Sequence, residues 1–250
     1  MKRTTLLYST LALLLGFTAC TQDDLSSSSG ELRGTPMTFT ATGLTPSAGT
    51  RATVDGDWEG VSTVAVQIGS EVKEYRVILS TDNLTATLGS DAPHYWAAGD
   101  TVTVSAWWPY TKGEATMPAV VVQADQRGNG YAKSDHIGVA EELLHYNGGT
   151  PTLAFTHRTA HVVVTVTSGT QTVSSVRLTN LSTADGNPGE IIAHDAGSGT
   201  YEALVAPQSV AQGTAFVTIA TADGKTYAYR LENNAEWNAG AEYKYDIRIE

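Results

Sequence analysis

His157 and His161 have the H-x-x-x-H spacing that, on a helix, brings two imidazoles to one face where they can bind zinc. The residues around them, Phe155 and the run Val162–Val166, are instead typical of a strand. Four residues along a strand span about 13 Å, which is too far for two ligands of one metal ion. No glutamate or third ligand accompanies the pair. We therefore predict a buried His157 near a domain junction, no metal site and no cofactor.

Other patterns that could support catalysis are incomplete. Asp55 and Asp57 resemble the start of a calcium-binding loop, but the remaining ligand positions do not follow. The stretch Gly128-Asn129-Gly130 lacks the Lys-Ser/Thr ending of a phosphate-binding loop, and the Gly-x-Ser-x-Gly motif of hydrolases is absent. Glu141 and Glu142 are adjacent, so their side chains diverge. We predict that the protein is not an enzyme.

Three aromatic residues, Trp107, Trp108 and Tyr110, could stack against a sugar ring. Neighbouring residues of a strand face opposite sides, so at least one of the two tryptophans belongs in the core. The other is a candidate glycan contact. The simpler interpretation is that both fill the core, as aromatic residues usually do.

Cys20 is the only cysteine, and it follows a segment with the marks of a secretory signal. Two basic residues precede an apolar run over residues 6–17, which is followed by small residues. The run is shorter than the roughly 20 residues needed to span a bilayer. Residues 17–20, Phe-Thr-Ala-Cys, resemble the lipobox of bacterial lipoproteins. We predict that residues 1–19 are a signal peptide and that Cys20 is lipidated; the alternative is a free thiol.

Residues 20–35 have the composition of a flexible linker, with a Ser-rich stretch at 26–30. Near its start, residues 21–24 (Thr-Gln-Asp-Asp) resemble the surface-export signal of Bacteroidetes lipoproteins. The alternative is a solvated start to the linker. We predict a surface-exposed lipoprotein held in the outer membrane through the lipid on Cys20.

The charge balance excludes some classes of partner. The chain has 15 basic and 26 acidic residues. Removal of Lys2 and Arg3 with the signal peptide leaves 13 basic residues and a formal charge of −13. Nucleic acids and anionic lipid headgroups both favour Lys and Arg, so we predict no nucleic-acid partner.

The mature sequence is typical of an all-β protein. Short runs alternate apolar, β-branched or aromatic residues with polar ones and are interrupted by Gly, Asn, Asp or Pro, which indicates half-buried antiparallel strands. Only residues 140–146 look able to form a short helical turn. The alternating runs lie at 37–41, 61–68, 72–79, 101–108, 119–123, 152–155, 161–166, 173–181, 201–205, 215–220, 227–231 and 243–249.

A tryptophan followed three residues later by glycine recurs before two of these strands, at Trp96 with Gly99 and at Trp237 with Gly240. We interpret it as a turn that needs glycine, preceded by an aromatic that covers the edge of a core. One copy in each half of the chain predicts two similar domains, with a boundary near residues 150–156.

The order of motifs along the chain resembles the fimbrillin family, the Mfa-like lipoproteins of Bacteroidetes. The matching stretches are Met37–Ala41, Thr50–Thr53, Trp58, Trp96–Asp100, Ser105–Tyr110, Asp125-Gln126, Ser134-Asp135, Leu153–Ala160, Ala206–Gln208 and Trp237–Ile249. The resemblance implies two tandem transthyretin-like β-sandwich domains, at 36–152 and 153–250. It also implies a structural subunit (stalk, anchor or tip) of a type V pilus with a role in adhesion. The implied partners are other pilin subunits, through donor-strand exchange, and a host or bacterial surface ligand.

In this family a protease that cuts after arginine removes the first strand, and a strand of the next subunit replaces it. Here the exchanged strand would carry Met37, Phe39 and Ala41. A cut at Arg51 would release that strand, whereas a cut at Arg33 would remove only the tether. The alternative is that Arg51 is an uncut loop residue in a monomeric surface lipoprotein that binds glycan or protein without polymerising.

The C-terminal segment Glu242–Glu250 is a candidate donor strand, because Tyr243, Tyr245, Ile247 and Ile249 alternate along it. The alternative is that this segment is a strand of its own domain.

Overall fold

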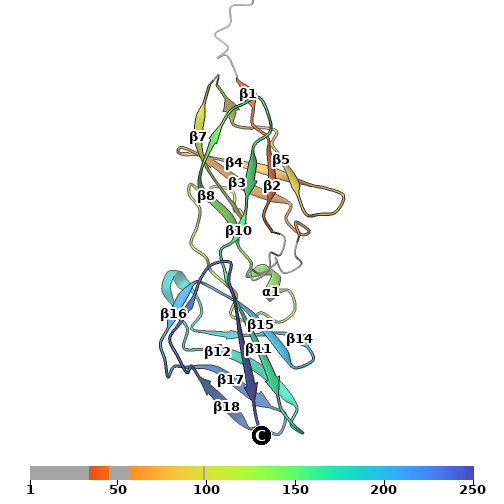
Figure 1. The fold of residues 1–250 in the computed structure, drawn as a ribbon, viewed down its shortest axis with the longest axis vertical. Coiled ribbons are helices and arrows are strands. Elements are labelled where there is room, and N and C mark those ends of the chain that lie inside the picture. The colour runs from red at the N-terminus through yellow and green to blue at the C-terminus, as the bar shows by residue number, and fades with distance from the viewer. Residues whose placement is uncertain (1–33, 45–56, 98) are drawn as a thin grey trace, which may run out of the picture. The chain divides into compact units, whose positions relative to one another are not determined.

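The computed structural model describes residues 34–44, 57–97 and 99–250, and these residues form an almost entirely β structure (Figure 1). The helical elements among them are α1 (Gly130–Lys133) and the short 3-10 turn η1 (Ala184–Gly186). No helix in these ranges is long and apolar enough to cross a bilayer. The all-β class expected from the alternation is confirmed.

The first part of the chain forms one large sheet with the strand order β10-β8-β7-β3-β4-β5-β2-β9. β9 and β10 are separated by a single residue, so the stretch 152–157 pairs with β2 at one end of the sheet and with β8 at the other. The strands are β10 (Thr156–His157), β8 (Ile137–His145), β7 (Thr101–Trp108), β3 (Thr63–Ile68), β4 (Glu71–Leu79), β5 (Ala86–Gly89), β2 (Phe39–Thr42) and β9 (Thr152–Ala154). A separate pair joins β1 (Thr35–Pro36) to β6 (Tyr95–Trp96).

Alternating apolar residues of this sheet form a first core. In β3, for example, Val64 and Val66 face it, as the period of two requires. Its buried members are Met37, Phe39, Ala41, Leu44, Trp58, Val61, Val64, Val66, Tyr75, Ala86, Leu88, Trp96, Val104, Ala106, Ile137, Val139, Leu144, Leu153 and Phe155.

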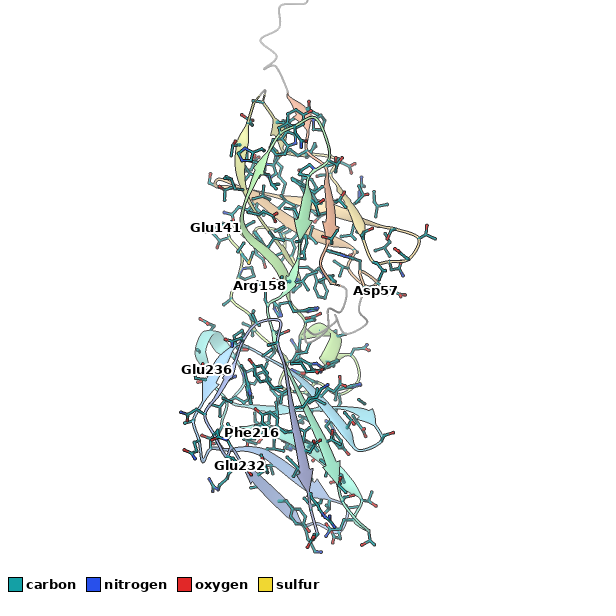
Figure 2. The ribbon with its side chains drawn as sticks, in the orientation of Figure 1. Asp57, Glu141, Arg158, Phe216, Glu232 and Glu236 are labelled. Atoms are coloured by element: carbon teal, nitrogen blue, oxygen red, sulfur yellow. The ribbon has the colours of Figure 1, made fainter. Side chains whose placement is uncertain are left out.

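The second part forms two four-stranded sheets with the orders β14-β15-β11-β20 and β13-β12-β17-β18. Residues of both sheets share a second core, which includes Val164, Leu178, Ala203 and Phe216, so the two sheets form a sandwich (Figure 2). The strands are β14 (His194–Gly197), β15 (Thr200–Val205), β11 (Ala160–Thr167), β20 (Glu242–Arg248), β13 (Glu190–Ile192), β12 (Val173–Thr179), β17 (Ala215–Thr221) and β18 (Thr226–Arg230), with a small pair β16 (Gln208–Val210) and β19 (Ala235–Trp237).

The segment before α1 also belongs to this sandwich. Val122 is buried in the second core, and its N–H donates to the side chain of Asn187. The Gln126 amide donates to the Leu204 carbonyl (2.7 Å) and accepts from the Leu204 N–H (2.8 Å), as a strand residue would. Leu153 and Phe155, in contrast, lie in the first core. The boundary between residues 152 and 153 remains a prediction.

The Trp-x-x-Gly turns behave as expected. Gly99 and Gly240 have φ of +74° and +73°, a region that glycine enters without steric cost. Trp96 is buried in the first core and Trp237 in the second.

The expectation of a helical turn at 140–146 is wrong, because these residues lie mostly in β8. Glu141 has φ +52°, and the pairing of β7 with β8 shifts at this point, so the strand carries an irregularity rather than a helix (Figure 2). The N–H of Glu141 donates to the Ser105 hydroxyl instead of to a ladder carbonyl.

Candidate functional site

Strand β2, which carries the candidate exchanged residues, is bonded on both edges (Figure 1). It pairs antiparallel with β5, with Phe39 opposite Leu88, and parallel with β9, with Ala41 opposite Leu153. The Thr40 N–H donates to Pro151 O (2.9 Å), and Thr42 O accepts from the Phe155 N–H (2.9 Å). Loss of β2 would therefore leave unpaired backbone groups on both neighbours.

The inward side chains of this segment are fully buried. Met37, Phe39, Ala41 and Leu44 are each at most 1% exposed. The Phe39 ring packs against Tyr75 with 5.5 Å between ring centroids. Burial of a side chain of this size contributes about 1.5–3 kcal/mol, so the strand supplies a substantial share of the first core.

A tight turn ends the segment at Gly43. Its φ is +98°, and a Cβ built there would lie 2.4 Å from the Phe155 carbonyl oxygen, so only glycine fits. The chain between Leu44 and Asp57, which contains the candidate cleavage residue Arg51, lies outside the described residues, as do Arg33 and the lipidation residue Cys20.

The candidate donor segment forms β20 at the edge of its sheet, where it pairs parallel with β11 (Figure 1). Ile247 and Ile249 are buried in the second core, and Tyr245 packs on Phe216 with 4.6 Å between centroids. In this structure the segment is a strand of its own sandwich, which was the alternative to a donor role.

The two histidines have separate environments. His157 is buried, as expected, with Nδ1 2.9 Å from the Asp135 carboxylate. His161 has Nε2 3.2 Å from Glu202 and Nδ1 3.3 Å from Glu242. The hydrogen bond from His161, with that from Tyr131, holds the pKa of Glu202 below its ordinary value. Within the described ranges, no group of three potential metal ligands gathers.

The partners of the histidines were not predicted from the sequence. Asp135 precedes His157 by 22 residues and Glu202 follows His161 by 41. The strand pairing that joins them is not visible in local spacing.

The aromatic residues do not form one platform. Trp107 is fully buried, and its Nε1 donates to Glu114 (2.8 Å). Trp108 is half-buried against the first core, so the two tryptophans face opposite sides of β7 as expected. Tyr110 lines a different surface hollow from Trp108.

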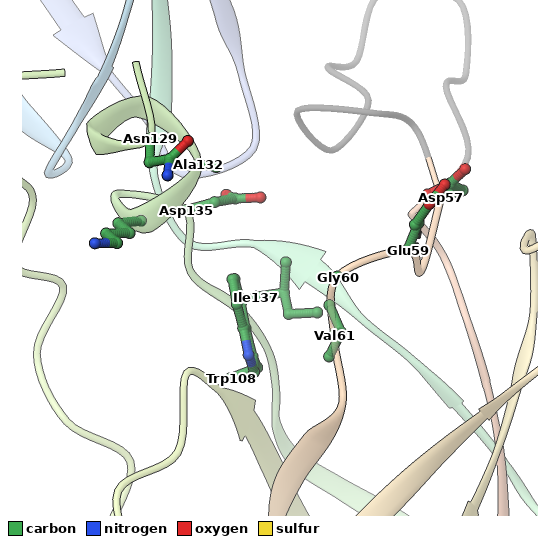
Figure 3. A pocket seen from close by; sticks show the side chains of 10 residues that line it. Asp57, Glu59, Gly60, Val61, Trp108, Asn129, Ala132, Asp135 and Ile137 are labelled. Atoms are coloured by element: carbon green, nitrogen blue, oxygen red, sulfur yellow. Dashed lines mark hydrogen bonds between the residues drawn. The ribbon is translucent and has the colours of Figure 1, made fainter. Parts of the chain in front are cut away.

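Trp108 lines a pocket of about 310 Å³ beside α1 (Figure 3). Val61 and Ile137 supply further apolar wall, while Asn129 and Lys133 border it from α1 and its N-terminal flank. The carboxylates of Asp57, Glu59 and Asp135 also line the pocket. An indole beside amide, ammonium and carboxylate groups has the chemistry of a site for a small polar ligand with an apolar face.

Comparison with known proteins places this structure among solved folds. It is similar to a candidate cell adhesion protein from Bacteroides uniformis (17% identity, TM-score 0.59, covering 86% of this chain and 92% of that one). It is also similar to a candidate cell adhesion protein from Bacteroides ovatus, with 13% identity and a TM-score of 0.59, and to one from Bacteroides fragilis, with 13% identity and a TM-score of 0.51. Each match covers 87% of this chain and 93% of the other. At these identities the likeness shows the fold alone.

A search of curated proteins found no match. The model of the family described as fimbrillin-like matches residues 50–250, well over half of the chain. The expected resemblance is thereby confirmed, and the chain belongs to the fimbrillin-like family.

Proposed function

We propose that the protein is a structural subunit (stalk, anchor or tip) of a cell-surface fimbria of the type V class, with a role in adhesion. The lipid on Cys20 delivers it to the outer membrane, with the folded chain exposed at the surface. Membership of the fimbrillin-like family supports this role. The observation that carries the assembly mechanism is the position of β2, bonded on both edges and buried along one face.

Cleavage after Arg51 activates the subunit. That cut lies C-terminal to β2, so β1 and β2 leave with the N-terminal fragment. A groove remains between β5 and β9, with unpaired backbone groups and the apolar sites of Met37, Phe39 and Ala41. A strand from the next subunit then restores both the ladder and the core. A cut after Arg33 leaves β2 in place and opens no groove.

The donor strand is the C-terminal segment Glu242–Glu250 of another pilin subunit. Its apolar residues Tyr243, Tyr245, Ile247 and Ile249 recur with the same period of two as those of β2. Donation requires β20 to leave β11. β20 is hydrogen-bonded to its sheet along one edge, the edge that faces β11.

Limited trypsin treatment of the full chain tests this proposal, with Arg51→Ala and Arg33→Ala as matched variants. We expect the wild type and Arg33→Ala to lose residues 34–44 and to form ladders of oligomers on electrophoresis without boiling. Arg51→Ala should form no ladder. A wild-type chain that is cut at Arg51 and forms no ladder would contradict strand exchange.

The second candidate function is a monomeric surface lipoprotein that binds a glycan, and the half-buried Trp108 in its pocket favours it. Glycan-array binding that is lost in Trp108→Ala, in a chain that never forms oligomers, would favour this alternative.

A further inference from the structure

The outer edge of β20 is unpaired within the part of the chain that the structure describes. β20 is the last strand in the order β14-β15-β11-β20. The Ala241 carbonyl and the Ile249 N–H both bond to β11. Backbone groups alternate along a strand, so those of Glu242, Lys244, Asp246 and Arg248 point to the open edge. Such an edge can add another strand.

The same four residues carry the exposed charges of β20. Their side chains alternate with Tyr243, Tyr245 and Ile247, which face the second core. The exposed sequence is acid, base, acid, base. Lys244 is 70% exposed and Arg248 78% exposed, so both can reach a strand added at the edge.

This order of charges is self-complementary. If a second copy of β20 pairs antiparallel about a two-fold axis at Tyr245, Glu242 lies opposite Arg248 and Lys244 opposite Asp246. Each such pair consists of two residues whose backbone groups face the edge, as a hydrogen-bonded antiparallel pair requires.

Neighbouring registers are disfavoured. A shift of the axis to Lys244 places Lys244 opposite its own copy and Glu242 opposite Asp246. A shift to Asp246 places two aspartates opposite each other and Lys244 opposite Arg248. Like charges directly opposite destabilise a sheet, so these two axes are disfavoured. The axis at Tyr245 is the one that places all four charges of Glu242–Arg248 opposite a charge of the other sign.

The edges at β18 and β14 lack this property. β18 exposes Thr226, Ala228 and Arg230, which have no acidic partner in a second copy. β14 exposes Asp195, Ala196 and Gly197, and its ladder is irregular between Asp195 and Gly197, which blunts an edge.

We propose that two copies of this chain associate through β20, antiparallel, about a two-fold axis at Tyr245. The two sheets of order β14-β15-β11-β20 then join into one continuous sheet across the pair. This association uses β20 while it remains bonded to β11, so it is separate from strand exchange and does not depend on it. Glu242 already contacts Lys244 and His161, so the Lys244–Asp246 pair is the one to test.

Charge exchange at the inner pair tests the proposal. The full chain with Cys20→Ser is studied in a mild detergent. Its mass is measured by sedimentation over a range of protein concentrations that includes the micromolar dissociation constant expected for a small interface. Lys244→Asp places two acids opposite each other, and Asp246→Lys places two bases. Each variant alone should weaken the dimer by about tenfold or more.

Two combinations should restore association. The double variant Lys244→Asp/Asp246→Lys regains opposite charges in the homodimer. An equimolar mixture of the two single variants regains them only in the heterodimer, which differently tagged chains reveal. The matched control is the exposed pair Asp223 and Lys225 in the β17–β18 turn, whose charge reversal should leave the dimer unchanged.

A wild type that stays monomeric throughout this range would overturn the proposal. So would a dimer that persists in both single variants, or single variants that fail to recover on mixing. Unchanged circular dichroism of the variants is expected because Lys244 and Asp246 are exposed, and it separates loss of pairing from loss of folding.

Discussion

β2, near the start of the described chain, and β20, its last strand, both have a period of two, yet they hold different positions in their sheets. β2 is bonded on both edges and carries no charge, whereas β20 is bonded on one edge and alternates charges with core residues. Loss of an inner strand breaks a ladder in two, whereas loss of an edge strand only exposes the next edge. The comparison indicates that β2 defines a groove to be filled, and β20 a strand that can meet another chain.

The largest expected effect is at the centre of β2. Phe39→Ala should lower the free energy of unfolding by about 3–5 kcal/mol, because it empties a fully buried aromatic site. Thr40→Ala, on the other face of the same strand, is the control and should change it by less than about 0.5 kcal/mol. Urea unfolding measures both. Equal effects would contradict the role of β2 as a core strand.

A smaller effect is expected in β20. Ile247→Ala should lower the free energy of unfolding by about 2–3 kcal/mol, near the low end for this change, because an edge strand relaxes more easily. The same urea titration measures it. A loss larger than that of Phe39→Ala would reverse the comparison of the two strands.

The turn after β2 gives a third test. Gly43→Ala should cost about 2 kcal/mol or more, since the new methyl group meets the Phe155 carbonyl in addition to the strain of positive φ. Gly60→Ala is matched, because Gly60 has φ +84° but nothing within 4 Å of the added carbon. It should cost only about 1 kcal/mol. Thermal unfolding measures both. Equal melting temperatures of the two variants would show that the close approach of Gly43 to the Phe155 carbonyl does not by itself require glycine there.

The smallest expected effect is a pH dependence beside β20. The hydrogen bond from His161 lowers the pKa of Glu202 below the ordinary 4.5. A carboxyl whose pKa is lower in the folded state stabilises the fold above 4.5 and loses that contribution as the pH falls through the lowered value. Thermal unfolding should therefore show that Glu202→Gln removes part of the wild-type loss of stability on acidification below 4.5. If the melting temperatures of the wild type and Glu202→Gln fall by the same amount on acidification, this contribution of Glu202 is absent.

Local patterns predicted many of the strands but not how they pair. Residues 119–123, expected to form a strand, do not, and β5, β13 and β14 were not predicted. The alternation in Met37–Ala41 predicted a strand with a buried face, and it is buried. Nothing near that segment indicates that β9, more than a hundred residues away, runs parallel beside it. The local sequence at 140–146 suggested a helical turn because it carries no sign of the pairing with β7. That pairing, between residues far apart in the chain, is what makes this stretch a strand. The charges of β20 are visible in the sequence, but their meaning depends on an open edge that only the topology reveals.

If β2 is the strand removed before assembly, the N-terminal mass of the protein in surface fimbriae will show it. Fimbriae sheared from cells are analysed by mass spectrometry of the intact subunit. Cleavage after Arg51 predicts a chain that starts at Ala52 and lacks Met37, Phe39 and Ala41. Fimbrial subunits that all begin at an acylated Cys20 and retain β2 would contradict it.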